Sequence, residues 1–519
     1  MKPSRRSAAL LSVASLAVPL TIGACNKGKP VPEFTRSEQL MMCGEVPACD
    51  QGVTVAADSP TLLVTDPAAL AALPLEDVLG KIIEQAPGPA RPPEETLQRM
   101  FDTNNDVANA VFSSTPHCDS DDINGAHING PAAQCPRKEG ALAKSTGFFE
   151  PGHPDHFIPV AAVNRFDLTT ISGGSCGEYR LIYAKESGLT NPDDRIFIIF
   201  EATLPNPNPG CLLGCRPVAE YWQSLAAEKD PAVLAQKLRA FFLEGLPDSN
   251  FGPPMHANNL GIGSQGGYNG GFTGQVRLSQ HVGDEWELRQ FSAGFDMDGE
   301  LAFVPVLVGN NPFPSYFELP VETDTQEQVM IKESFTEDFV FTSVDRLAAA
   351  RVQDMSANVS LFFLSGESAL GGDAINDYVA RAQGNHLLTD AIEDHIEDAD
   401  LGADCPADDP LTADSIVRRA AVQSCAGCHA PAKFLGPERK LGCGLTFPES
   451  LGEVQIDEKG NRSPALKDVF LPHRAKVLST YLQACNEEEI AASFAGTPNN
   501  GGGELRASRP RTLGGSSTH

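Results

Sequence analysis

Three residues with reactive side chains lie near the carboxyl end of the chain, in the order Cys425-Ala426-Gly427-Cys428-His429. Two thiols at this spacing can each form a thioether with a vinyl group of a porphyrin, and the imidazole that follows directly can bind the iron. The two intervening residues are small and would let the backbone pass close to the ring. The motif occurs once, and it predicts one covalently bound c-type haem held by Cys425, Cys428 and His429.

Two other chemistries use closely spaced cysteines. A zinc site would require a second Cys/His pair at matching spacing, and none follows the motif. A thioredoxin-like redox pair would require a preceding strand and would not need the histidine. The haem is therefore the expected occupant.

The segment before the motif has the pattern of a helix that leads directly into it. Thr412 is a suitable N-cap, Asp414 suits the helix dipole, and apolar residues recur at i,i+4 spacing over residues 416–421. A second helix is expected over residues 475–485, with an apolar face that we expect to pack against the first helix. Residues 412–487 resemble a class I cytochrome c, which implies a small all-α cytochrome c domain.

The identity of the second axial ligand departs from this resemblance, which implies a methionine just before the final helix. All eight methionines of the chain lie at or before Met355. His473 stands at the expected position instead and is the predicted second ligand of the iron. Ligation by two imidazoles would lower the reduction potential relative to His/Met ligation. The alternatives are a five-coordinate iron and a ligand from another part of the chain.

An acidic stretch marked by proline and glycine, residues 397–411, is the predicted linker between this module and the rest of the chain. Upstream of it, residues 145–396 have the pattern of an α+β domain with a mostly antiparallel sheet, and residues 61–144 that of a helical and loop-rich region. The expected strands are residues 157–166, 178–184, 195–201, 274–279, 285–292, 301–308 and 339–342. The α+β domain weakly resembles uncharacterised exported bacterial proteins, which implies no chemistry.

Charged residues alternate with aromatic ones beside two of the expected strands. Arg165 and Asp167 flank Phe166, and Glu178 and Arg180 flank Tyr179. These charges either line a cleft or form buried ion pairs. The sequence leaves both possibilities open.

The amino terminus has the pattern of an export signal, with a basic start and an apolar stretch too short for a membrane span. The residues Ile22-Gly23-Ala24-Cys25 resemble a bacterial lipobox. This resemblance implies removal of residues 1–24, lipidation of Cys25 and anchoring in the cell envelope, at the outer membrane or on the periplasmic side. The alternative is an ordinary signal peptide followed by a stray cysteine. Residues 25–60 are the expected tether, and residues 488–519 are the expected disordered tail.

The cysteine count agrees with export. Of 13 cysteines, one would be lipidated and two would hold haem, so that ten remain. An even number in an oxidising compartment predicts up to five disulfides. Closeness in sequence favours the pairs Cys43–Cys49, Cys118–Cys135 and Cys211–Cys215.

The charge of the chain restricts its partners. With 39 basic and 68 acidic residues the net charge is −29, which argues against nucleic acid and anionic membrane surfaces. A redox partner protein with a basic docking surface is compatible with it. The predicted function is one-electron transfer outside the cytoplasm. Two alternatives are an oxidoreductase whose α+β domain oxidises a small substrate, and a binding or sensor lipoprotein of the envelope.

Overall fold

The computed structural model describes residues 43, 52–119, 135–261, 274–282, 285–370 and 376–494. The predicted signal peptide, the predicted lipidation site Cys25, most of the predicted tether and the chain beyond residue 494 lie outside these residues. Within them, no helix is both long and apolar enough to cross a membrane. The start of the predicted disordered tail is wrong, because residues 487–493 form helix α14 (Glu487–Ser493), in which Ile490 is fully buried.

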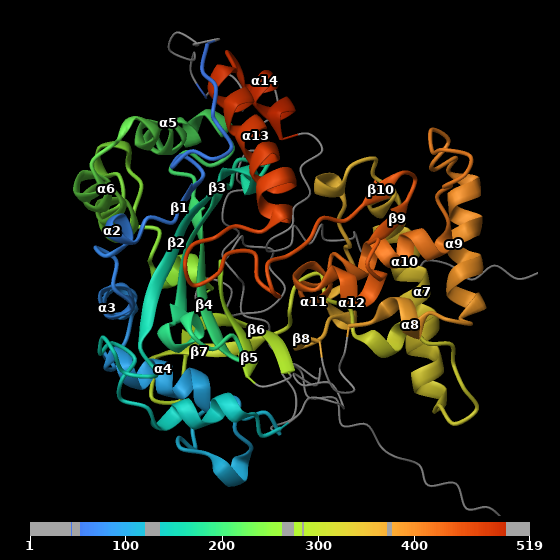
Figure 1. The fold of residues 1–519 in the computed structure, drawn as a ribbon, viewed down its shortest axis with the longest axis horizontal. Coiled ribbons are helices and arrows are strands. Elements are labelled where there is room, and N and C mark those ends of the chain that lie inside the picture. Colours follow the sequence, from blue (N-terminus) through green and yellow to red (C-terminus); the bar gives the residue numbers. More distant parts are fainter. Residues whose placement is uncertain are drawn as a thin grey trace, which may run out of the picture.

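An antiparallel sheet of eight strands forms the centre of the molecule (Figure 1). Seven strands neighbour one another in sequence order, and the eighth, β8, pairs with β6. The strands are β1 (Leu63–Val64), β2 (Phe157–Arg165), β3 (Ser175–Lys185), β4 (Asp194–Pro205), β5 (Gln275–Val282), β6 (Glu285–Phe295), β7 (Leu301–Val306) and β8 (Glu367–Ala369). Together with the helices, this antiparallel sheet agrees with the predicted α+β class.

One predicted strand is wrong. Residues 339–342 lie in the long helix α7 (Gln326–Leu347), which begins with a capping box at Thr325. The run Phe-Val-Phe-Thr has high strand propensity, but Phe335 and Phe339 are four residues apart and both are fully buried, as helical periodicity requires. Burial of this helical face overrides the local propensity.

One face of the sheet packs against helices from the first half of the chain (Figure 1). These helices are α2 (Pro67–Leu70), α3 (Leu75–Gln85), α4 (Pro93–Asp102), α5 (Arg216–Ser224) and α6 (Pro231–Glu244). Tyr179 of β3 is fully buried on this side and stacks on Trp222 of α5, with ring centroids 5.7 Å apart. The region predicted over residues 61–144 and the sheet therefore share one core.

A second core is built from helices and lies to the right in Figure 1. It contains α7, α8 (Tyr378–Arg381), α9 (His386–Asp398) and α10 (Ala413–Ala421). Leu401 and Leu411 pack in this core, and Cys405 is bonded to Cys443. Residues 397–411 are thus a packed connection between α9 and α10. The prediction that this segment is an interdomain linker is wrong. Its charges and prolines indicate a turn-rich surface segment, but the helices on either side of it belong to the same core.

The last long helix, α13 (Leu471–Gln483), packs on the core of the sheet. Its Tyr481 is fully buried, with its ring centroid 4.6 Å from that of Phe166, and its hydroxyl donates to the Leu212 carbonyl at 2.8 Å. The expected packing of this helix against α10 is wrong. An apolar stripe predicts that a helix is buried but does not identify its partner.

The segment between α10 and α13 joins the two cores. It contains α11 (Cys425–His429), α12 (Pro431–Leu435) and a small hairpin of β9 (Lys440–Gly442) and β10 (Leu445–Thr446). Helix α11, which carries the Cys-x-x-Cys-His motif, packs on β6 and β8. Residues 412–487 are therefore divided between two cores, and their haem-binding segment depends on the sheet.

The described residues contain four disulfides: Cys43–Cys211, Cys118–Cys135, Cys176–Cys215 and Cys405–Cys443; Cys485 is disulfide-bonded as well. The predicted pair Cys118–Cys135 is confirmed, whereas Cys43–Cys49 and Cys211–Cys215 are wrong. Closeness in sequence misleads here because the fold brings the start of β3 beside the start of α5, so that Cys176 meets Cys215. Disulfides in this number are typical of an oxidising compartment.

A buried charge cluster lies on the side of β6 and β8 that faces away from α11. Glu287 Oε2 lies 2.6 Å from Arg137 Nε, Arg137 also pairs with Glu139 at 2.8 Å, and Glu367 stands opposite Arg289 in the strand register. These five residues carry three carboxylates and two guanidinium groups. Burial is the main cause that raises the pKa of Glu367 to about 8, and repulsion from the neighbouring Glu287 carboxylate adds to it.

We expect Glu367→Gln to gain stability relative to the wild type as the pH rises. Because the folded-state pKa of Glu367 lies above its ordinary value of 4.5, the folded state binds the proton more tightly than the unfolded state. The wild-type contribution is greatest below pH 4.5 and declines toward pH 8, by up to ~1.4 kcal/mol per pH unit. The glutamine side chain does not titrate, so the stability of the variant lacks this pH dependence. Urea unfolding at about pH 5 and about pH 8 measures the effect, and an equal difference between the two proteins at both values would contradict it.

Candidate functional site

Helix α11 begins with a tight turn that requires a small residue. The Oγ of its N-cap Ser424 accepts a hydrogen bond from the Gly427 N–H at 3.0 Å and donates one to the Ala421 carbonyl at 2.7 Å. A Cβ atom at Gly427 would lie 1.9 Å from the same carbonyl oxygen. The structure thus explains Gly427 by the turn between α10 and α11.

The sheet holds the motif directly. The Ala426 N–H donates to Ser368 Oγ of β8 at 2.9 Å. The ring of Trp286 in β6 lies 5.0 Å from the His429 ring, measured between centroids. Neither Trp286 nor Ser368 was predicted from the sequence, because neither belongs to a recognisable motif and each lies far from residue 425 along the chain.

His429 is oriented by a backbone acceptor. Its Nδ1 lies 2.8 Å from the Glu453 carbonyl oxygen, and since a carbonyl can only accept, Nδ1 carries the proton. Burial lowers the pKa of His429, which favours the neutral ring. The Nε2 lone pair is therefore available for a metal, in the tautomer and with the hydrogen bond that metal-binding histidines use.

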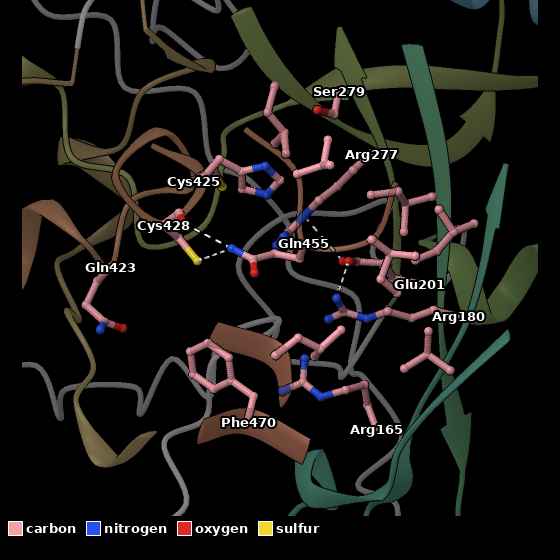
Figure 2. A pocket seen from close by; sticks show the side chains of 18 of the residues that line it. Arg165, Arg180, Glu201, Arg277, Ser279, Gln423, Cys425, Cys428, Gln455 and Phe470 are labelled. Carbon is pink, nitrogen blue, oxygen red and sulfur yellow. Dashed lines mark hydrogen bonds and ion pairs between the residues drawn. The ribbon is translucent and has the colours of Figure 1, made fainter. Parts of the chain in front are cut away.

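The two thiols of the motif are free. Burial raises the pKa of Cys425, and it raises the pKa of Cys428 to about 12, so both are neutral thiols. Gln455 donates from Nε2 to the Cys428 carbonyl at 3.0 Å, and the same nitrogen lies 3.6 Å from Cys428 Sγ (Figure 2). The motif thus presents two uncharged sulfurs on one short helix.

The zinc alternative finds no support in the geometry. Across the described ranges, the single group of three metal-ligand atoms within 4.8 Å of one another is Cys43, Cys211 and Glu487, and its two cysteines form a disulfide. No such group includes Cys425, Cys428 or His429. Their donor atoms therefore do not converge on one point, as a tetrahedral zinc site would require.

A cavity lies between the two cysteines of the motif and strands β2–β5 of the sheet. Figure 2 shows Cys425 and Cys428 on one wall and Arg180 and Glu201 of the sheet on the opposite wall. The cavity has a volume of about 270 Å³, near the lower end of the roughly 300–1,000 Å³ typical of ligand pockets. Its apolar lining residues are Leu63, Val163, Ile182, Phe197, Ile199, Leu288, Val352, Val422, Phe447, Val454, Ile456, Leu466 and Phe470. Along each strand, the residues that line the cavity alternate with residues whose side chains pack on the helices that cover the other face of the sheet.

His473 lines the same cavity from the first turn of α13. Its Nε2 is buried and has no hydrogen-bond partner in the part of the chain that the structure describes. Burial lowers the pKa of His473, so the ring is neutral. This ring nitrogen therefore has no competing partner among the described residues and is available to bind a metal. The structure therefore brings His429 and His473 to one cavity, although α13, which carries His473, packs on the core of the sheet.

One end of the cavity is charged. Arg165 pairs with Asp167, with Nη2 and Oδ2 2.9 Å apart. Arg180 pairs with Glu201, with Nη1 and Oε1 2.8 Å apart, and Arg277 lies 3.3 Å from the other oxygen of Glu201. The two interpretations that the sequence left open both hold, because these charges line a cleft and also form buried ion pairs.

The neighbouring arginines keep the carboxyl groups of Asp167 and Glu201 ionised. Burial alone would raise the pKa of Asp167, but Arg165 and Arg474 outweigh it and hold that pKa at about 2. Arg180 and Arg277 likewise outweigh burial at Glu201 and lower its pKa. Both carboxylates are therefore ionised at neutral pH.

The residues present fit a covalently attached haem. They supply two neutral thiols, a proximal imidazole with a free Nε2, a second imidazole with an unpartnered Nε2, an apolar wall and a cationic end. Glu201 and Arg277 were not predicted from the sequence; the signal available was a charge between apolar residues inside a strand. Comparisons of the chain with protein-family models, with curated proteins and with solved structures found no match.

Proposed function

We propose that this chain is a mono-haem c-type cytochrome that transfers one electron at a time between partners outside the cytoplasm. The observation that carries the proposal is the single cavity lined by the Cys-x-x-Cys-His motif and by His473. The chain's own contribution is to fix a haem covalently through Cys425 and Cys428 and to offer His429 and His473 as its axial ligands.

Thioether formation between the two cysteines and a haem would require no oxidant. Each thiol would add across one vinyl group: the S–H bond would break, an S–C bond would form, and the hydrogen would go to the other vinyl carbon. The neutral state of both buried thiols provides that hydrogen. Once bound, the haem supplies one-electron chemistry by alternating between ferric and ferrous iron.

The cellular location of the protein is part of the same proposal. The disulfides support an oxidising compartment, and we propose that Cys25 is lipidated and anchors the chain in the cell envelope, at the outer membrane or on its periplasmic side. The net charge of −29 suits a redox partner with a basic docking surface.

The experiment that tests this function is a reductive titration of the purified protein, with carbon monoxide added at the end. We expect a single one-electron transition and no carbon monoxide binding, because two imidazoles fill both axial positions. In His473→Ala the ferric spectrum is expected to change from low spin to high spin, and the reduced protein is expected to bind carbon monoxide. His395→Ala, a histidine of α9 paired with Asp345, is the control.

Carbon monoxide binding by the wild type would contradict the electron-carrier function and favour a catalyst or sensor. An unchanged low-spin spectrum in His473→Ala, measured by visible absorption and magnetic circular dichroism, would exclude His473 as the ligand while leaving the haem site itself intact.

A further inference from the structure

Four arginines gather at one end of the cavity. Arg165, Arg180 and Arg277 come from strands β2, β3 and β5 of the sheet, and Arg474 comes from α13. Figure 2 shows Arg165 and Arg180 across the cavity from Cys425 and Cys428, and Arg277 extending from its strand into the space between them. Their side chains are largely buried, with exposed fractions between 11% and 17%.

The carboxylates paired with these arginines are too few to neutralise them. The partners are Asp167, Glu178 and Glu201, three anions for four cations. Burial raises the pKa of Glu178, which can only increase the positive excess. The wall therefore carries at least one uncompensated positive charge in a buried place, where such a charge is costly.

Two of the arginines are incompletely paired. The Nε of Arg277 has no hydrogen-bond partner in the described residues and approaches Glu201 only to 3.3 Å. The Nε of Arg474 lies 3.9 Å from the nearest oxygen of Asp167. Arg277 and Arg474 therefore each have an N–H donor available for an anion.

A haem brings two carboxylates to this place. Its vinyl groups stand on two adjacent pyrroles and its propionates on the other two, so the propionate edge lies opposite the edge bonded to the cysteines. We propose that Arg277 and Arg474, supported by Arg165 and Arg180, bind the two haem propionates; this inference rests on the proposed function. The excess charge of the wall and the single positive charge of the ferric haem core together balance two propionates. The sheet is then the anion-binding half of the haem site.

The test is the reduction potential of Arg277→Gln and Arg474→Gln. Removing a positive charge near the iron favours the ferric state, so we expect each variant to retain covalent haem and to shift its potential downward by at least a tenfold change in the redox equilibrium, about 59 mV for one electron. Arg277→Lys keeps the charge and is expected to shift less. Arg195→Gln is the matched control, because Arg195 lies in β4, pairs with Glu458 and does not line the cavity.

A second measurement needs no variant. Haem made from aminolaevulinic acid labelled with ¹³C at its carboxyl carbon marks the propionates in the infrared spectrum of the wild type. Arginine-bound propionates are expected to remain ionised at about pH 5, whereas unpaired buried ones would be protonated. Protonated propionate bands, or wild-type potentials in both glutamine variants, would overturn the inference while haem remains bound. Absence of covalent haem from the wild type would instead overturn the proposed function.

Discussion

Cys425→Ala/Cys428→Ala is expected to lack covalent haem completely. Both thioethers are lost, and His429 alone cannot keep the cofactor through extraction with acidic acetone. The measurement is the visible spectrum of the extracted protein, which we expect to be featureless for the variant and to keep the haem bands for the wild type. Each single variant keeps one thiol and is expected to retain part of the haem.

The matched control removes two cysteines elsewhere. Cys118→Ala/Cys135→Ala opens a disulfide with a sequence separation of 17 residues that lies outside the cavity. It is expected to cost ~3 kcal/mol of stability by the loop-entropy argument and to keep its haem. Full haem retention by the Cys425/Cys428 variant would contradict the assignment of these thiols.

Tyr481→Ala is expected to destabilise the protein by ~3–5 kcal/mol, the range for large aromatic residues in a core. Tyr481 is fully buried, packs against Phe166 and Phe494, and donates to the Leu212 carbonyl. Since His473 lies on the same helix, loss of this contact is also expected to weaken its ligation and to raise the high-spin fraction. Urea unfolding and the visible spectrum measure the two effects.

Tyr481→Phe isolates the hydroxyl. It keeps the ring and removes only the hydrogen bond to Leu212, so we expect a loss of ~1 kcal/mol and an unchanged spectrum. If Tyr481→Ala were as stable as Tyr481→Phe, the anchoring of α13 in the core of the sheet would be wrong.

Local signals predict the elements of this fold well. The runs over residues 157–166, 178–184 and 195–201 are strands β2, β3 and β4, because β-branched and aromatic residues between turn residues leave few alternatives. Thr412 is the N-cap of α10, and its side chain accepts from the Ser415 N–H. Each of these features depends on a few consecutive residues.

Features that depend on distant partners could not be predicted in the same way. The apolar stripe of α13 fits either core, and only the fold decides that it meets Phe166 and not α10. The pairing of Cys176 with Cys215 likewise depends on where β3 starts relative to α5. The charged end of the cavity exists because neighbouring strands align Arg180 with Glu201, a register that no single strand encodes.

The division of residues 412–487 between two cores changes how the proposed haem site would be built. A self-contained module would bring both axial histidines from its own helices. Here α11 presents His429 from its contact with β6 and β8, while α13, packed on the core of the sheet, presents His473. In the proposed site, the larger part of the chain would therefore form half of the haem pocket.

The most direct test of the central claim is mass spectrometry of the wild-type chain, produced in a host that matures c-type cytochromes and extracted with acidic acetone. The account predicts the mass of the chain plus one haem, with the added mass on the peptide that contains Cys425 and Cys428. A chain without added mass, or haem that is removed by the extraction, would contradict it.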